Sequence, residues 1–412
     1  MSTDRSPSPA PAPLGLAPIL SVRGLCKHFP IRGKGIFARA VETVRAVDDV
    51  TFDLNPGETL GPVGESGSGK TTAARCILRA ITPTAGEVRF RKRDGATVDP
   101  ATLPEGALKP LRPHMQTIFQ DPFSCLNPQM TVGEIVAEPL VIHRMGDRAE
   151  REARVVDILK KVGLKAEHRS RYPHAFSGGQ RQRIGIARAP IMRPSLVVAD
   201  EAVSAFDVSV QARVLNLLKD LQAEFKPTYL FVAHNLDVVR HFCDRVAVLL
   251  RRTCGRTIPD QGNFFGSEAS YTRASLSAVP WPDPDVKMKF DVPEEIADPS
   301  RLPRGCAFHP RCKECFDPCR TVRPNLGTIV GTHRQVACHL HPIEPVSGSE
   351  RRERAPVVRE RGGSGRTRPR RPCSPRRRTI VFEMDIFGHF HPACRLSPEH
   401  SLPCLSIPST FG

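Results

Sequence analysis

The sequence predicts an α/β protein built on a mixed β-sheet core. Three observations carry this prediction. A glycine-rich segment, residues 64–71, lies between a short apolar run and a helical pattern. Two further apolar runs end in polar residues, one in Asp200-Glu201 and the other in His234. Strands that are apolar throughout, with polar side chains at their carboxyl ends, are typical of a parallel sheet covered by helices on both faces.

Residues 64–71 match the phosphate-binding pattern G-x-x-x-x-G-K-[ST] at every fixed position. Glycines let backbone N–H groups turn towards phosphate oxygens, and the N-terminus of the following helix adds partial positive charge. Lys70 is expected to reach the outer phosphates, and the Thr71 hydroxyl is expected to bind Mg²⁺. The residues expected to contact a nucleotide here are Gly64, Glu65, Ser66, Gly67, Ser68, Gly69, Lys70, Thr71 and Thr72.

Two strands are expected ahead of this loop. One begins at Ile19, and the other covers residues 50–54 before an Asn-Pro-Gly turn, which favours antiparallel pairing. Phe29 lies shortly after the start of the first of them, in Lys27-His28-Phe29-Pro30. Its ring either packs in the core, as most phenylalanines do, or offers a face on which adenine can stack.

After the loop, a strand over residues 115–119 runs into Gln120, whose amide carbonyl can coordinate Mg²⁺ or orient a water molecule. Residues 131–170 then carry apolar side chains at helical spacing among charged ones, which predicts a helical insert. The turn Ser177-Gly178-Gly179-Gln180 follows and opens another helix. Its hydroxyl and backbone donors at a helix N-terminus predict a second phosphate-binding surface.

Acidic residues follow the next buried strand. Asp200 suits a Mg²⁺ ligand, Glu201 suits a base that acts on water, and Asp207 comes shortly after them. His234 ends the following strand. Each of these side chains alone is compatible with a structural cap, but together with Gln120 they favour a catalytic site.

Composition sets limits on the class of protein. Residues 347–378 hold twelve arginines against three glutamates, so this low-complexity tail supplies +9 of the net charge of +17. The net positive charge of the chain is therefore weak evidence that its folded part binds nucleic acid. No stretch reaches the about 18 to 20 consecutive apolar residues of a membrane helix. Thirteen cysteines without a secretion signal fit a reducing cytosol.

Four cysteines near the C-terminus are separated by 5, 6 and 18 residues: Cys306, Cys312, Cys319 and Cys338. Thiolates that converge from loops suit a [4Fe–4S] cluster or Zn²⁺, and the alternative is a set of reduced cysteines in a loop-rich lobe. This lobe is poor in long apolar runs and lies far in sequence from the nucleotide-binding residues. We expect a metal there to be structural and to stabilise the lobe without affecting nucleotide chemistry.

Taken in this order, the motifs resemble those of the nucleotide-binding subunit of an ABC transporter. The similarity runs from about residue 20 to residue 341, about three quarters of the chain. Segments such as Met130-Thr-Val-Gly-Glu-Ile135 and Arg171-Tyr-Pro-His174 resemble those of the di- and oligopeptide importer branch. The subunits of that branch carry a C-terminal cysteine extension. The resemblance implies a P-loop, RecA-like core with an antiparallel β subdomain, a helical insert and a small loop-rich C-terminal lobe.

The resemblance also implies roles for the site residues. ATP and Mg²⁺ would be the cofactors, with Thr71, Gln120 and Asp200 at the metal. Glu201 would polarise the attacking water, and His234 would contact the γ-phosphate. Phe29 falls where such proteins stack adenine. Ser177, Gly178, Gly179 and Gln180 would contact the ATP of the opposite subunit, and Asp207 is placed with the nucleotide-binding residues.

Partners and domains follow from the same resemblance. It implies a peripheral subunit at the cytoplasmic face of the inner membrane, with integral-membrane permease subunits, a second ABC ATPase subunit that is identical or related, and an external solute-binding protein acting indirectly. No nucleic acid is expected. The expected divisions are a disordered leader (1–18), the nucleotide-binding domain (19–275, insert about 125–180), the cysteine-containing extension (276–342) and a basic, disordered tail (343–412).

Three functions stay open. The first is a transport ATPase for peptides or for another small solute such as nickel. The second is a soluble ABC ATPase acting on nucleic acid or ribosomes, which usually carries two nucleotide domains or a coiled-coil insert. The third is a degenerate subunit that binds ATP with little hydrolysis. Four departures from the family pattern favour the third function, the degenerate subunit. They are Pro62 in a central strand, Pro190 interrupting a helix, Ala202 and Asn235.

Overall fold

The computed structural model describes residues 17–32, 40–121, 124–204, 207–250, 253–258, 303–332, 334–345, 382–384 and 390–392. Most of the leader and tail expected to be disordered lies outside these residues, as does the expected domain boundary near residue 275. The chain divides into two units, Met1–Arg352 and Glu353–Gly412. In the second unit, β14 (Phe382–Met384) pairs antiparallel with β15 (Phe390–Pro392).

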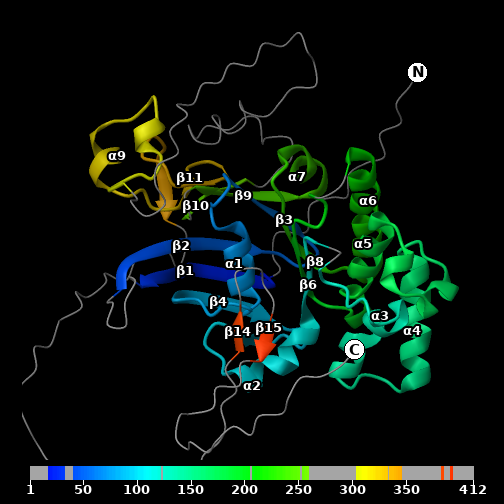
Figure 1. Ribbon diagram of the computed structural model, residues 1–412. Helices are drawn as coiled ribbons and strands as arrows, with labels where there is room; N and C mark the ends of the chain where they lie inside the picture. The colour runs from blue at the N-terminus through cyan, green and yellow to red at the C-terminus, as the bar shows by residue number, and fades with distance from the viewer. Residues whose placement is uncertain are drawn as a thin grey trace, which may run out of the picture. The chain divides into compact units, whose positions relative to one another are not determined.

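The main sheet has the strand order β13-β11-β12-β10-β9-β3-β8-β7-β6. Figure 1 labels β11, β10, β9, β3, β8 and β6 of it. Its strands are β3 (Thr59–Val63), β6 (Met115–Ile118), β7 (Leu196–Asp200), β8 (Thr228–Val232), β9 (Arg245–Leu250), β10 (Thr253–Ile258), β11 (Gly327–Ile329), β12 (Gln335–Val336) and β13 (Ile343–Pro345). The run from β9 to β6 pairs in parallel, whereas β10 to β13 pair antiparallel. The predicted mixed sheet is confirmed.

A second, antiparallel sheet has the order β2-β1-β4-β5. It is formed by β1 (Leu20–Arg32), β2 (Ala40–Leu54), β4 (Ala85–Arg91) and β5 (Thr97–Val98). The two long strands cover the residues in which antiparallel strands were expected, so this part of the predicted fold is also confirmed.

The α-helices are α1 (Lys70–Ile77), α2 (Glu105–Leu108), α3 (Val132–Ile142), α4 (Arg148–Lys161), α5 (Gly178–Ala187), α6 (Val208–Phe225), α7 (Leu236–Phe242) and α9 (Asp317–Thr321). Short 3₁₀ turns are η1 (Lys109–His114), η2 (Ala166–Ser170), η3 (Pro173–Ala175), η4 (Pro190–Met192) and η6 (His309–Arg311). Helices α3, α4 and α5 each begin with a capping box, in which Thr131, Asp147 and Ser177 satisfy the first free N–H groups.

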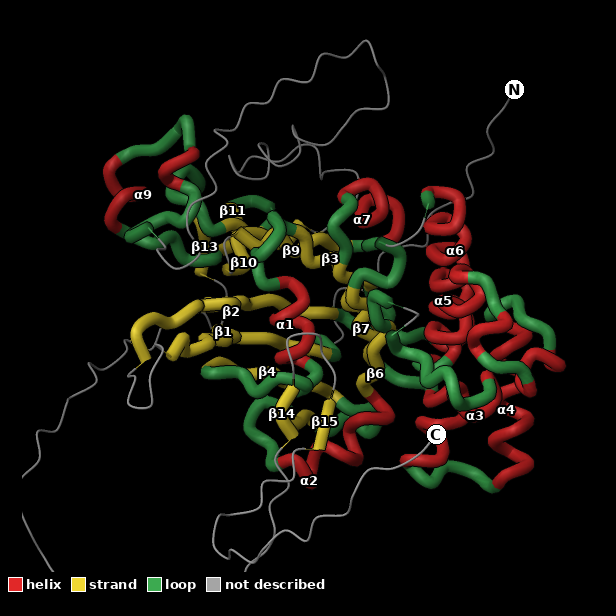
Figure 2. Tube along the Cα trace, viewed as in Figure 1, coloured by secondary structure: helices red, strands yellow, loops and turns green. Residues whose placement is uncertain are grey.

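The two faces of the parallel strands belong to different cores. Along β7, Leu196 and Val198 pack with α1 and the antiparallel sheet, while Val197 and Ala199 pack with the helices from α3 to α7. Figure 2 shows α3 to α6 gathered on one side of β6 to β8, with α1 beside β1 and β2. Since side chains alternate along a strand, the apolar run of β7 supplies both cores at once.

Two prolines are accommodated by the backbone around them. β3 pairs with β9 through Val63, but its ladder to β8 ends at Leu60, two residues before Pro62. Pro190 was expected to interrupt the helix after residues 177–180, and this is wrong. Helix α5 ends at Ala187, and Pro190 opens η4, a position at which a proline's missing N–H is not needed.

The C-terminal extension continues the main sheet. β12 pairs with β10 through Val336 and Gln335, and β11 and β13 add to its other side. The sequence predicted a loop-rich lobe and not these strands. Among the residues that the structure describes, no helix has both the length and the apolar composition needed to cross a membrane.

Candidate active site

The glycine-rich loop joins the end of β3 to the start of α1. Gly64 has φ +156° and Gly69 has φ +91°, and neither has room for a side chain. A Cβ atom at Gly64 would collide with the Leu249 carbonyl oxygen, and one at Gly69 would collide with that of Ala46. Only glycine therefore fits these two positions, and the backbone of the loop is held against β9 and β2.

Lys70 is buried inside this loop. Its Nζ donates hydrogen bonds to the carbonyl oxygens of Gly64 (2.8 Å) and Glu65 (3.0 Å). Burial holds the pKa of Lys70 below its ordinary value, although the nearby Glu201 and Glu65 carboxylates oppose this effect. A buried ammonium at a helix N-terminus makes a site that suits an anion.

The two strongest candidates for Mg²⁺ ligation are in contact. Thr71 Oγ1 donates to Asp200 Oδ1 at 2.9 Å. Burial raises the pKa of Asp200 above its ordinary value, while the hydrogen bond from Thr71 and the charge of Arg75 act in the opposite direction. A hydroxyl and a carboxylate are oxygen ligands of the kind Mg²⁺ prefers, so the residues present fit this ion.

Glu201 lies between the other two predicted catalytic side chains. Gln120 Nε2 donates to Glu201 Oε2 at 2.6 Å, and His234 Nε2 is 2.5 Å from Glu201 Oε1. These side chains follow β6, β7 and β8, whose carboxyl ends meet at one edge of the parallel sheet. The structure therefore joins Gln120, Glu201 and His234 into one hydrogen-bonded group.

The backbone of Glu201 adopts a left-handed conformation, with φ +52°. Its N–H donates to the Val232 carbonyl at 2.9 Å, and Ser204 Oγ donates to the Glu201 carbonyl at 3.0 Å. A non-glycine residue held in this region stores strain, which is common at functional sites.

Gln182, which the sequence analysis missed, supports this turn from α5. It is fully buried and donates from Nε2 to the Ala202 carbonyl at 2.6 Å. No sequence signal marked it, since Gln182 stands between Arg181 and Arg183.

Three predicted contact groups make their described contacts outside this cluster. Ser177 caps α5, and its side-chain hydrogen bonds are made with Gln180 of the same turn. Asp207 caps α6 by accepting from the Val210 N–H at 2.9 Å. Phe29 is 39% exposed, with Lys27 Nζ 4.8 Å from its ring centroid. The structure joins none of these residues to Lys70 or Glu201 by a described hydrogen bond.

The four candidate cysteine ligands come together in the extension. Burial raises the pKa of Cys306, and the nearby thiols of Cys319, Cys338 and Cys312 raise it further. Among the described residues, the group of three or more possible ligand atoms within 4.8 Å of one another is Cys26, His28 and Asp48.

The group of Cys26, His28 and Asp48 is an ion-paired cluster. Arg323 Nη1 lies 3.1 Å from Asp48 Oδ2, and His28 Nε2 lies 3.5 Å from Asp48 Oδ1. The guanidinium holds the pKa of Asp48 below its ordinary value against the effect of burial. Arg323 therefore already supplies the positive charge that this carboxylate needs.

The cysteine-containing extension also reaches the glycine-rich loop. Arg311, which precedes Cys312, places Nη1 2.7 Å from Glu65 Oε1. The extension was expected to be independent of nucleotide chemistry because of its distance in sequence. In the folded chain, however, Arg311 of the extension lies against Glu65 of the glycine-rich loop.

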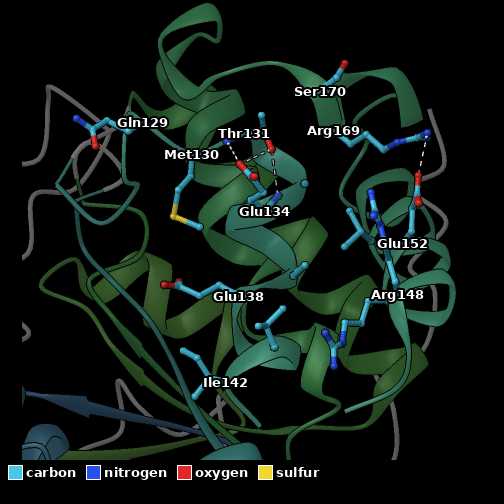
Figure 3. A pocket seen from close by; sticks show the side chains of 15 residues that line it. Gln129, Met130, Thr131, Glu134, Glu138, Ile142, Arg148, Glu152, Arg169 and Ser170 are labelled. Atoms are coloured by element: carbon cyan, nitrogen blue, oxygen red, sulfur yellow. Dashed lines mark hydrogen bonds and ion pairs between the residues drawn. The ribbon is translucent and has the colours of Figure 1, made fainter. Parts of the chain in front are cut away.

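A groove of about 800 Å³ lies between α3 and α4 (Figure 3). Thr131 and Glu134 lie at its α3 side, and the ion pair of Arg169 with Glu152 lies at its α4 side. Ile142, more than half exposed, adds apolar surface. The helical insert therefore presents a hollow with a partly apolar lining.

Comparison with known proteins decides the family. The family model described as ABC transporter matches residues 47–204, and the one described as oligopeptide/dipeptide transporter, C-terminal region, matches residues 264–319. A Brucella ovis relative whose name refers to peptide import is 46% identical over 317 residues, which cover 77% of this chain and 96% of the relative. The chain belongs to the ATP-binding subunits of ABC transporters.

Two further similarities bear on this ABC subunit. The oligopeptide transport ATP-binding protein AppF of Bacillus subtilis is 44% identical over 78% of this chain and 97% of its own length. A dimeric structure of the ATP-binding cassette MJ0796 in a post-hydrolysis state, bound to ADP and Pi, is 29% identical with a TM-score of 0.50, covering 58% of this chain and 98% of that one. The ABC subunit is accordingly an ATPase, and the resemblance inferred from its motifs is confirmed.

Proposed function

We propose that this ABC subunit couples ATP hydrolysis to the uptake of di- or oligopeptides across the cytoplasmic membrane. The observation that carries the hydrolytic part is the meeting of Gln120, Glu201 and His234 beside the Lys70 loop at one edge of the sheet. The peptide specificity is supported by the match to the peptide-transporter C-terminal region and by the relatives' names. Uptake of another small solute, such as nickel, is the alternative.

We assign roles to the site residues from their contacts. Lys70 and the loop N–H groups would bind the ATP phosphates, while Thr71, Asp200 and Gln120 would hold Mg²⁺, which neutralises phosphate charge. Glu201 would accept a proton from water, because a carboxylate fixed by two hydrogen bonds is oriented for that role. His234 Nε2 would be free to turn from Glu201 towards the γ-phosphate.

We propose that hydrolysis takes place between two subunits. The Ser177-Gly178-Gly179-Gln180 turn sits at the N-terminus of α5 and makes its side-chain hydrogen bonds within itself, which leaves it able to meet the ATP of another subunit. The dimeric structure of MJ0796 bound to ADP and Pi supports this arrangement. The partner would be a second copy or a related ABC subunit.

We propose that the groove between α3 and α4 receives the permease at the cytoplasmic face of the inner membrane. Arg188, which directly follows α5, connects that helix to the groove: Nη2 is 2.7 Å from Glu138 Oε2 in the groove, and Nη1 donates to the Cys125 carbonyl at 3.0 Å. Movement of Gln120 and α5 on hydrolysis could thereby reach the membrane subunits. A solute-binding protein outside the membrane would deliver the peptide.

The proposed function is tested by reconstitution with the permease subunits in proteoliposomes. Enclosed Mg-ATP should drive uptake of a labelled di- or oligopeptide delivered by the cognate binding protein, and Lys70→Ala should stop it because the loop loses its cation. Nickel uptake is measured in parallel. ATP-dependent accumulation of nickel and not of peptides would contradict the peptide assignment.

We propose that Cys306, Cys312, Cys319 and Cys338 hold one metal centre. Burial and the neighbouring cysteines raise the pKa of Cys306 and of Cys338, so a cationic centre would stabilise their thiolates. Tetrahedral Zn–S bonds of about 2.3 Å would bring the sulfurs to about 3.8 Å from one another. A [4Fe–4S] cluster, in which each thiolate binds a different iron atom, is the other centre that accepts four cysteines.

Metal analysis after anaerobic purification checks this assignment. The parent protein should contain either zinc or iron and sulfide with a visible absorption band, and Cys312→Ser should lose the metal and melt at a lower temperature. Cys315→Ser is the matched control, since Cys315 lies in the same extension outside the set of four, and it should keep the metal. A parent protein with less than about a tenth of an equivalent of any metal would show that these are ordinary thiols.

A further inference from the structure

A bidentate ion pair joins the C-terminal extension to the phosphate-binding loop. Arg311 Nη1 donates to Glu65 Oε1 at 2.7 Å, and Nη2 donates to Glu65 Oε2 at 3.2 Å. The Arg311 side chain is only 5% exposed, and the two residues are 246 positions apart. Parallel hydrogen bonds between a guanidinium and a carboxylate fix orientation as well as charge, because both groups are planar.

Packing holds the Arg311 side chain in place. The residue ends η6, and its guanidinium carbon lies 5.3 Å from the centroid of the Phe308 ring. Phe308 is itself buried and belongs to the core that α3 to α7 form with the sheet. The arginine is therefore presented from a packed part of the extension.

Glu65 is linked to the phosphate-binding lysine through its backbone. Its carbonyl oxygen accepts from Lys70 Nζ at 3.0 Å and from the Ser68 N–H at 3.0 Å. Holding the Glu65 side chain restricts the rotation of this peptide unit, and with it the orientation of the loop's N–H groups. The ion pair thus acts on the part of the loop that would surround the phosphates.

We infer that Arg311 is a positioning residue for nucleotide binding: by holding Glu65, the C-terminal extension keeps the phosphate-binding loop in its binding conformation. The inference rests on the proposed ATP binding at this loop. If Arg311 has this role, ATP affinity depends on the contact between the C-terminal extension and the phosphate-binding loop. Cys312 adjoins Arg311 in the chain, so a structural change at the cysteine group would act directly on the ion pair between Arg311 and Glu65.

The test compares Arg311→Gln with Arg323→Gln in the full chain. Arg323 also ties the extension to the nucleotide-binding part, through Asp48 of β2, but it does not touch the loop. Affinity for a fluorescent ATP analogue, KM and kcat of the permease complex, and the melting temperature are measured for both. Arg311→Gln should weaken ATP binding and raise KM about fivefold or more with little change in kcat. Arg323→Gln should lower the melting temperature without raising KM.

Two further variants separate positioning from general stability. Arg311→Lys keeps the charge but not the paired geometry and should restore part of the affinity. In a Glu65→Gln background, Arg311→Gln should add little to the loss, because the interaction has already been removed. Equal rises in KM for Arg311→Gln and Arg323→Gln, or an undiminished effect of Arg311→Gln in the Glu65→Gln background, would overturn the inference.

Failure of the proposed function would appear differently. If the unmodified chain does not bind the ATP analogue, or binds it equally well with Lys70→Ala, nucleotide binding at this loop is wrong and the inference falls with it. If the unmodified chain binds the analogue, Lys70→Ala does not, and Arg311→Gln matches the unmodified chain, only the positioning role of Arg311 is wrong.

Discussion

Glu201→Gln should bind ATP as the unmodified protein does and lose at least about 100-fold in kcat, the usual scale for removing a general base. The amide keeps the size of the side chain and can still hydrogen-bond to Gln120 and His234, so the site should keep its shape. It cannot accept the proton of the attacking water as a carboxylate does. ATP turnover of the permease complex and binding of the ATP analogue measure the two effects separately.

Glu58→Gln is the matched control for this variant. Glu58 is also a buried carboxylate, but it pairs with Arg245 at the start of β3, whereas the phosphate-binding loop follows the end of that strand. The control should lose stability and keep its kcat per folded molecule, because it breaks a buried pair away from the site. If Glu201→Gln retains turnover within a few fold of the parent, the base is another group.

Gly69→Ala is expected to abolish nucleotide binding and to lower stability by about 2–4 kcal/mol, the combined scale of backbone strain and overpacking. Its φ of +91° is unfavourable for alanine, and the new methyl group would displace the Ala46 carbonyl of β2. The loop and β2 would have to move apart. The melting temperature and the affinity for the ATP analogue report these two consequences.

Gly106→Ala serves as the comparison for Gly69→Ala. Gly106 lies in α2, and a Cβ atom there would meet nothing within 4 Å. Alanine should be neutral or slightly stabilising at this position, because it loses less conformational freedom in a helix. An unchanged melting temperature and ATP affinity for Gly69→Ala would mean that the loop relaxes at no cost.

The sequence by itself determined the features that depend on neighbouring residues. The glycine-lysine spacing of residues 64–71 specified the loop, and the apolar run before Asp200-Glu201 specified a buried strand. The capping residue Ser177 specified where α5 begins. Each of these signals lies within one segment, since backbone conformation and strand burial leave periodic or fixed patterns there.

Only the tertiary structure decided which distant segments meet. Nothing near Arg311 distinguishes it from the other basic residues until the fold places it against Glu65. The same holds for Gln182, which supports the turn after Glu201, and for β12, which extends the main sheet through β10. These contacts depend on register and packing between elements that are far apart in the chain. The residues next to a side chain in the sequence therefore do not identify its partner.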